Sequence, residues 1–213
     1  MKRFLLADRQ GITRAGLMFL LGAIPDADYK FTEDKTELIN ALCETPDSIV
    51  VLDYTLFDIN DAAELLILSQ RFGNVHWVLF SEDLSANFVR MVIASSPQFS
   101  VLLKESPLQE IREALSFAMR GRRFICQRMA ELLLVPETRE KEQVKLTRTE
   151  TEVLKDIALG MTTREIAERR FSSFHTVNTH RKNIFRKLGV NNVHEATKYA
   201  LRAGLVDSAE YYI

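Results

Sequence analysis

Residues 1–121 alternate between short apolar runs and longer segments in which apolar residues recur every three or four positions. The apolar runs, which we expect to form strands, cover residues 3–7, 29–32, 48–53, 75–80 and 99–103. The segments with helical spacing cover residues 13–22, 35–43, 61–71, 85–95 and 107–120. Strands that alternate with helices predict βαβ units, and continuously apolar strands predict a sheet covered on both faces. The expected fold class is α/β, with a doubly wound (βα)5 domain.

The end of the chain has only helical patterns, over residues 146–160, 162–171, 172–190 and 192–205. Thr147 is placed to cap the first of these helices, Glu150 completes a capping box, and Gly160 ends the helix. The apolar positions expected to face the core are Val153, Leu154, Ile157, Ala158, Ile166, Ala167, Val177, Ile184, Leu188, Val193, Ala196, Ala200 and Leu201. The pattern therefore predicts an all-α domain of four helices over residues 146–213.

Residues 122–145 separate the two domains. We expect a short helix within residues 121–134. Residues 135–145 are highly charged, contain a proline and lack apolar periodicity, which is typical of a linker.

The composition, 46% apolar and 27% charged, is that of an ordinary globular protein. No apolar run reaches the ~20 residues that cross a bilayer, and the start lacks the build of a signal peptide. Cys43 and Cys126 are too few for a disulfide framework and are not spaced for zinc. We expect a cytoplasmic protein.

Charge divides the chain unevenly. Residues 1–136 carry 14 Lys and Arg against 18 Asp and Glu, whereas residues 137–213 carry 14 against 11. The basic residues between 164 and 187 are Arg164, Arg169, Arg170, Arg181, Lys182, Arg186 and Lys187. An acidic front and a basic rear suggest that the second domain faces an anion, although a solvated basic helix face is the commoner explanation.

The third helix of the rear domain favours nucleic acid. Opposite its predicted core positions lie Thr179, Lys182 and Arg186, and no acid occurs between Val177 and Lys187. Two short helices joined by a turn and backed by two more predict a helix-turn-helix. The outward face carries the hydroxyl and cationic donors that reading a major groove requires.

In the front domain, polar residues end four of the five strands: Asp8, Asp53, Ser81 and Lys104. The carboxyl ends of parallel strands meet at one edge of the sheet, where doubly wound domains bind their ligands. One acid after a strand could simply cap a helix, but four polar strand ends are more typical of a pocket.

The rear domain closely resembles the LuxR-type DNA-binding domain. The matching elements are "LT..E.EVL..IA.G", "EIA", "TV..H..NI..KLGV" and "A..YAL..GL" within residues 146–205. The front half resembles a receiver domain, which has a flavodoxin-like fold. The whole chain is similar to the NarL/FixJ group of bacterial response regulators.

This resemblance implies a transcription regulator that binds double-stranded promoter DNA as a homodimer, with the fourth rear helix helping to pair the subunits. Asn178, Thr179 and Lys182 would contact base edges, and Asn178 departs from the lysine common in the family. The residues assigned to phosphates are Thr176, Arg181, Arg186 and Lys187. His180 matches a family histidine, and we assign it to packing or a phosphate contact.

For the receiver, the resemblance implies phosphorylation of Asp53, Mg2+ held by acids after the first strand, and sensing by Ser81 and Lys104. Asp8 matches the family, but Arg9 stands where the family has a second metal-binding acid. This exchange removes a metal ligand and adds a fixed positive charge, so we expect the pocket to bind no metal. If Mg2+ does bind, its protein ligands are Asp8 and Asp53.

Arg9 has two possible orientations. Pointing inward, it would pair with Asp53 and occupy the place of the metal; pointing outward, it would leave the pocket unchanged. Phe57 in place of a proline, and Val101 in place of an aromatic residue, are further departures from the family. We expect a receiver that depends weakly or not at all on Mg-assisted phosphorylation.

Three alternatives stay open. The first is a conventional two-component regulator phosphorylated on Asp53 by a histidine kinase. The second is a phosphatase-like hydrolase with Asp53 as nucleophile, for which Asp58 is too loosely placed to serve as acid or base. The third is a protein-interaction adaptor that no longer binds DNA. We favour a non-enzymatic regulator that interacts with promoter DNA, with a second copy and with a sensor kinase or other regulatory protein, and not with a membrane.

Overall fold

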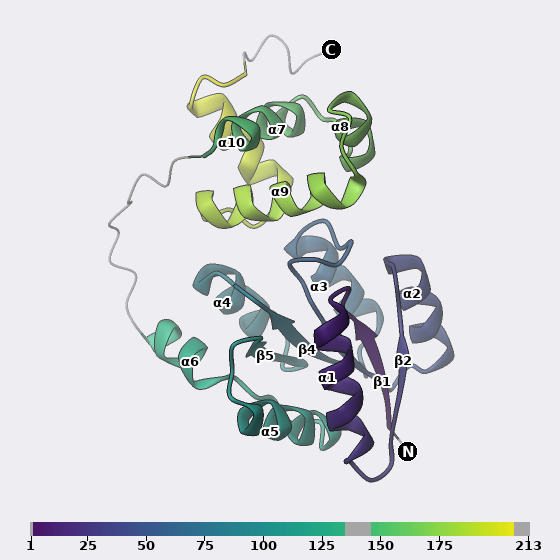
Figure 1. Cartoon of the computed structure of the whole chain (residues 1–213). Coiled ribbons are helices and arrows are strands. Elements are labelled where there is room, and N and C mark those ends of the chain that lie inside the picture. Colours follow the sequence, from purple (N-terminus) through teal and green to yellow (C-terminus); the bar gives the residue numbers. More distant parts are fainter. Residues whose placement is uncertain (1, 135–145, 207–213) are drawn as a thin grey trace. The chain divides into compact units, whose positions relative to one another are not determined.

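The structure, a computed structural model, describes residues 2–134 and 146–206. These residues form two compact units, the first with a sheet and the second all-helical (Figure 1). The expected linker at 135–145 lies outside the described residues.

The first unit contains one parallel sheet with the strand order β2-β1-β3-β4-β5. Its strands are β1 (Lys2–Ala7), β2 (Ala27–Phe31), β3 (Ile49–Leu52), β4 (His76–Ser81) and β5 (Phe99–Leu103). Every residue of β3, β4 and β5 is buried, as continuously apolar strands predict. The strand order changes direction at β1 and β3, so the carboxyl ends of these strands open onto one crevice.

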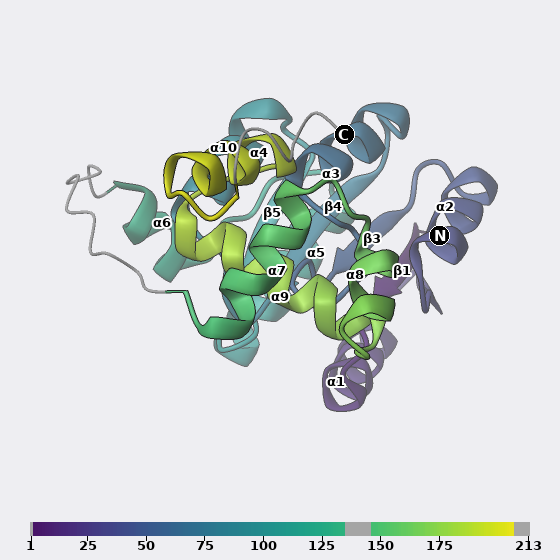
Figure 2. The same cartoon turned by 90° about the horizontal axis from the view of Figure 1, so that it is seen from above.

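Helices cover both faces of this sheet, with α1 and α5 on one side and α2, α3 and α4 on the other (Figure 2). They are α1 (Gly11–Gly22), α2 (Lys35–Glu44), α3 (Ala62–Arg71), α4 (Ala86–Ser95) and α5 (Leu108–Met119). This confirms the predicted doubly wound α/β fold. All ten elements of this repeat lie within a few residues of their predicted bounds.

After α5 the chain returns to the sheet. The amide of Val101 donates to the carbonyl of Phe124 (2.8 Å), and the amide of Cys126 donates to the carbonyl of Val101 (2.9 Å). Helix α6 (Gln127–Leu134) follows and buries Met129. The first unit therefore extends to α6, beyond the boundary expected at residue 121, because a segment too short for a strand pattern still pairs with β5.

The second unit contains α7 (Arg148–Ala158), α8 (Thr163–Arg169), α9 (Phe174–Leu188) and α10 (Val193–Arg202). The predicted capping box of Thr147 and Glu150 is present, and a second one begins α8 at Thr162. Ser173 caps α9, which ends at Gly189 in the left-handed conformation (φ 65°). Glycine adopts this conformation without the Cβ clash that other residues suffer.

One apolar cluster holds the four helices together. It includes the predicted core residues of α7 and α8 and, from α9 and α10, Val177, Ile184, Ala196 and Ala200. Helices α8 and α9 and the turn between them form the predicted helix-turn-helix. Among the described residues, no helix has the length and apolar character to cross a membrane.

Candidate acidic pocket and nucleic-acid interface

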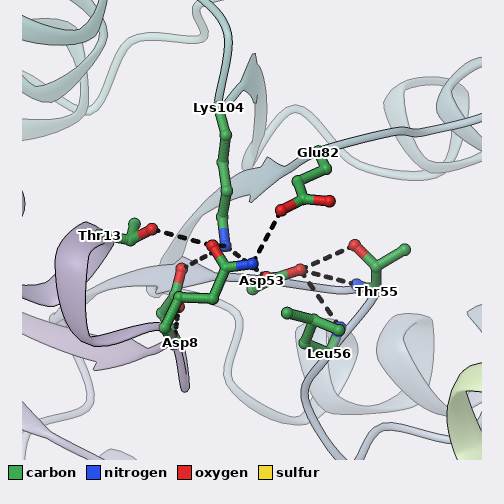
Figure 3. Close-up of polar contacts among 8 residues, drawn as sticks. Asp8, Thr13, Asp53, Thr55, Leu56, Glu82 and Lys104 are labelled. Atoms are coloured by element: carbon green, nitrogen blue, oxygen red, sulfur yellow. Dashed lines mark hydrogen bonds and ion pairs between the residues drawn. The ribbon is translucent and has the colours of Figure 1, made fainter.

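The carboxyl ends of β1, β3 and β5 place two buried acids around one lysine (Figure 3). The Nζ atom of Lys104 lies 2.8 Å from Oδ2 of Asp8 and 2.5 Å from Oδ2 of Asp53. Both carboxylates are almost fully buried, and Lys104 is only 10% exposed. Two buried acids this close would repel each other, so the ammonium between them supplies the compensating charge.

The second oxygen of Asp53 is held by the loop that follows β3. Its Oδ1 atom accepts hydrogen bonds from the amide (3.0 Å) and the hydroxyl (2.8 Å) of Thr55, and from the amide of Leu56 (3.2 Å). Both oxygens of the expected phosphorylation site are therefore bonded (Figure 3). These bonds fix the orientation of the carboxylate.

Gln10, the N-cap residue of α1, also belongs to this pocket, although it is part of no motif in the sequence. Its Oε1 atom accepts from Nζ of Lys104 (2.9 Å) and from the hydroxyl of Thr13 (3.1 Å). Its Nε2 atom donates to Oε1 of Glu82 (2.8 Å), directly after β4, and its amide donates to Oδ1 of Asp8 (2.7 Å). Gln10 thus connects β1, β4 and β5. The sequence feature that could have indicated this role is the position of Gln10, two residues after Asp8 and at the start of a helix.

Arg9 is exposed and does not replace the metal between the two acids. Its guanidinium donates through Nη2 (3.0 Å) and Nε (3.3 Å) to the backbone carbonyl of Glu33. The inward orientation, with Arg9 paired to Asp53, is therefore wrong for this structure. Lys104 already fills that place from the buried end of β5, while the long side chain of Arg9 reaches the loop after β2.

The pocket does not match the ligand set of Mg2+. No group of three or more Asp, Glu, His or Cys residues that could hold a metal occurs in the described parts of the chain. The two carboxylates that are present share one ammonium instead of converging on an open position. Burial raises the pKa of the Asp8 carboxyl above its usual value, although its bonds to Lys104 and to the Gln10 amide lower it. These residues fit a lysine counter-ion better than a divalent cation.

Ser81, the hydroxyl residue at the end of β4, is fully buried. Its Oγ atom has no hydrogen-bond partner among the described residues. The two other departures from the receiver pattern, Phe57 and Val101, are both fully buried and contribute to the core. The structure thus brings Asp8, Asp53 and Lys104 into contact, with Arg9 turned aside.

Helix α9 presents the expected DNA-binding residues unevenly. Thr176 and Arg186 are exposed, and Thr179 is half-buried with its hydroxyl donating to the carbonyl of His175 (3.1 Å). Three further expected residues, Asn178, Arg181 and Lys182, lie outside the apolar cluster that forms the core of this unit. The assignment of these residues to DNA stays a prediction.

The ammonium of Lys187 pairs with an acid of its own unit and is therefore not available to bind a DNA phosphate. Its Nζ atom lies 2.7 Å from Oε2 of Glu150, the capping-box acid of α7. The pKa of Glu150 is below its usual value: burial raises it, but the bonds from Lys187 and Thr147 lower it by more. Lys187 therefore connects α9 to the start of α7.

Two of the arginines in the basic region also have acidic partners. Nε of Arg170 lies 2.5 Å from Oδ2 of the buried Asp156, and Nη1 of Arg169 lies 3.4 Å from Oδ1 of the same residue. Nη2 of Arg170 donates to the carbonyl of Glu152 (2.8 Å). Part of the positive charge of this unit therefore stabilises the contact of α8 with α7.

Comparisons with known proteins agree with both units. The family model described as "Bacterial regulatory proteins, luxR family" matches residues 144–200. The chain is 28% identical over 212 residues to the transcriptional regulatory protein LiaR of Bacillus subtilis, covering 97% of this chain and all of LiaR. It is 26% identical over 212 residues to the response regulator protein VraR of Staphylococcus saprophyticus, covering 96% and 98% of the two chains.

A solved structure of two RcsB dimers bound to two parallel DNAs is similar in fold. It has a TM-score of 0.54 and 24% sequence identity and covers 97% of this chain and 99% of RcsB. Another structure, of the Salmonella enterica RcsB bound to a promoter, has a TM-score of 0.56 and 22% identity over 93% of this chain and 97% of that one.

Proposed function

We propose that this chain, a DNA-binding response regulator of the LuxR family, acts as a homodimer on promoter DNA and does not depend on Mg-assisted phosphorylation. The observation that carries the second part is the pairing of Lys104 with both Asp8 and Asp53. Phosphoryl transfer to Asp53 would need a divalent ion to neutralise developing charge. The position beside Asp8 holds Arg9 instead of a second carboxylate. Besides the Lys104 pairing, the missing ligand disfavours Mg2+; the guanidinium of Arg9 does not, because it binds the carbonyl of Glu33 outside the pocket.

On DNA, we assign α9 to the major groove. Asn178, Thr179 and Lys182 would contact base edges, and Thr176, Arg181 and Arg186 would contact phosphates. We remove Lys187 from the phosphate-binding set because its ammonium is paired with the buried Glu150. The partner is promoter DNA in the cytoplasm, and we expect no enzymatic activity.

Phosphorylation is tested by exposing the purified chain to a small phosphodonor and Mg2+ and weighing the intact protein. The wild type should gain little phosphate, and Arg9→Asp should gain far more because it restores the missing carboxylate. Asp53→Asn is the control for phosphate attached elsewhere. Stoichiometric phosphate on Asp53 of the wild type, with no further gain in Arg9→Asp, would contradict the proposal.

A second candidate is regulation through phosphorylation of Asp53 by a histidine kinase. The buried hydroxyl of Ser81 favours it, because an unsatisfied buried polar group costs about 1–3 kcal/mol and invites a functional explanation. In that case Lys104 would exchange one carboxylate for a phosphoryl oxygen. The phosphodonor experiment separates the two candidates.

A further inference from the structure

A cavity of about 190 Å3 lies at the amino-terminal ends of the strands, at the opposite edge of the sheet from the acidic pocket. Lys2 at the start of β1, Ile49 at the start of β3 and His76 at the start of β4 contribute to its wall, together with the loop before β5 and the end of α5. At about 30 Å3 per water molecule, this volume equals about six waters. The cavity therefore has room for a molecule of about six non-hydrogen atoms.

The wall of the cavity contains a buried imidazole, that of His76, which is only 7% exposed. Its Nε2 atom lies 2.8 Å from Oγ of Ser100, which also accepts a hydrogen bond from the amide of Phe124 (2.9 Å). The Ser100 hydroxyl is fully buried, and Nε2 is the only acceptor for its proton among the described residues. The hydroxyl therefore donates to Nε2, and the neutral imidazole carries its own proton on Nδ1.

The Nδ1–H group of His76 has no acceptor within residues 2–134 and 146–206. Because His76 lines the cavity and its Nε2 atom is turned towards β5, Nδ1 is the ring nitrogen that faces the cavity. A buried N–H group without an acceptor is costly, and a ligand that accepts from it removes that cost.

The charges around the cavity favour an anion. The guanidinium of Arg123 is close enough to the imidazole to contribute to the lowered pKa of His76. Nζ of Lys2 lies 3.1 Å from the backbone carbonyl oxygen and 3.2 Å from Oδ2 of Asp47. An ammonium has three protons, so one remains for a ligand after these two bonds. The opposing charge is that of Asp47, whose side chain is 70% exposed and already paired with Lys2.

We propose that this cavity is a binding site for a small carboxylate, which accepts hydrogen bonds from Nδ1–H of His76 and from the ammonium of Lys2. A carboxylate has two oxygens, so one ligand satisfies both donors. Phosphate fits less well, because its larger charge and additional oxygens need more donors than these two. The site is separate from the acidic pocket and from α9.

Ser100 connects this site to the segment that follows α5. Its hydroxyl donates to His76 and accepts from the Phe124 amide, and the carbonyl of Phe124 accepts from the amide of Val101 on β5. A ligand that accepts from Nδ1–H polarises the imidazole and strengthens the bond between Ser100 and Nε2, because successive hydrogen bonds polarise one another. The Phe124 amide should therefore respond to a ligand in the cavity.

Titration of the 15N-labelled full chain with acetate and with butyrate, at pH 7 and constant ionic strength, tests the site by NMR. The amides of Asn74 and Gln98 in the cavity wall, and that of Phe124, should shift with one common dissociation constant of about 10 mM or below. Acetamide, the neutral counterpart of acetate, should bind at least about 10-fold more weakly, because hydrogen bonds to an ionised acceptor are stronger.

Two variants remove the proposed donors. Lys2→Met should weaken butyrate binding at least about 10-fold. Lys30→Met is the matched control, since Lys30 is also a half-exposed lysine paired with an acid, Glu44, and it should leave the dissociation constant unchanged. His76→Phe removes the ring N–H and should abolish the three shifts, and the fluorescence of the buried Trp77 checks that this variant folds.

A single dissociation constant that rises in Lys2→Met and not in Lys30→Met supports the carboxylate site. Butyrate at about 50 mM that shifts none of the three amides beyond the effect of sodium chloride overturns it. Equal affinities for acetate and acetamide also overturn it, as does a ring spectrum of His76 with the proton on Nε2. Neither DNA nor a phosphodonor is present in these measurements, so the proposed function stands or falls independently of them.

Discussion

At the scale of single residues, some features of the acidic pocket can be predicted from the sequence and others cannot. Asp8, Asp53, Ser81 and Lys104 could be predicted, because strand ends in a parallel sheet share one edge. The direction of Arg9 could not, since a long flexible side chain reaches either the pocket or the neighbouring loop at similar cost. The role of Gln10 depends on three bonds to different strands, which no local pattern contains.

A second buried polar residue lies at the opposite end of the sheet. His76 begins β4, and its Nε2 atom lies 2.8 Å from Oγ of Ser100 on β5. Burial, together with the positive charge of Arg123, lowers the pKa of His76 from 6.5 to about 4. The folded state therefore holds a neutral imidazole.

We expect His76→Gln to change the pH dependence of stability. Because the unfolded chain binds a proton at His76 below pH 6.5 and the folded chain does not until about pH 4, stability falls as the pH falls through this window. Between pH 7 and pH 4 the wild type should lose about 3 kcal/mol more than the variant, whose side chain cannot ionise. Trp77, the single, fully buried tryptophan, reports unfolding of this unit by fluorescence. Parallel pH profiles for the two proteins would contradict the expected neutral histidine.

At the scale of elements, the helix ends were well predicted because capping is local. The box of Thr147 and Glu150, the serine cap at Ser173 and the glycine end at Gly189 all involve residues within a few positions of each other. Contacts between different helices were harder to predict from the sequence. Nothing in the spacing of Lys187 on α9 indicates that it pairs with the first turn of α7.

Glu150→Gln should destabilise the second unit by about 1–3 kcal/mol at neutral pH, because it removes the charge that pairs with Lys187 at a buried position. The pKa of Glu150 is lowered in the folded state, so its contribution is present above pH 4.5 and is lost as the pH falls through the lower folded value. The difference between wild type and variant should therefore shrink in acid.

Far-UV circular dichroism during denaturation follows the loss of helix in both units, and the fluorescence of Trp77 identifies the transition that belongs to the first unit. Lys187→Met is the partner variant in a double-mutant cycle. A constant difference from pH 7 to pH 3, or additive effects of the two substitutions, would mean that the ion pair contributes nothing.

At the scale of the whole molecule, the two-unit organisation follows from the change between alternating strand–helix patterns and purely helical ones. The boundary was harder to predict. Residues 124–126 pair with β5 without a strand pattern of their own, and this pairing carries α6 into the first unit. The division of charge was visible in the sequence, but the structure shows that Arg169, Arg170 and Lys187 compensate buried acids.

The remaining residues of α9 predict two kinds of DNA contact. Lys182→Ala should weaken binding to the specific site by about 1–3 kcal/mol and relax discrimination at one base pair. Arg186→Ala should weaken binding to all sequences alike and reduce the slope of log affinity against log salt by about 1. Fluorescence anisotropy on a selected operator and on an unrelated duplex measures both. Identical behaviour of the two variants would mean that the base-reading and phosphate-binding sides of α9 are assigned wrongly.

The ammonium of Lys104 has three protons, and three oxygens already receive them: one from Asp8, one from Asp53 and one from Gln10. A ligand that binds the ammonium of Lys104 must therefore displace one of these three oxygens. The amide of Gln10 is the only neutral member, so it should be the first to be exchanged. Binding of a ligand in the pocket would then change the contacts of Gln10 first, at the N-terminal end of α1.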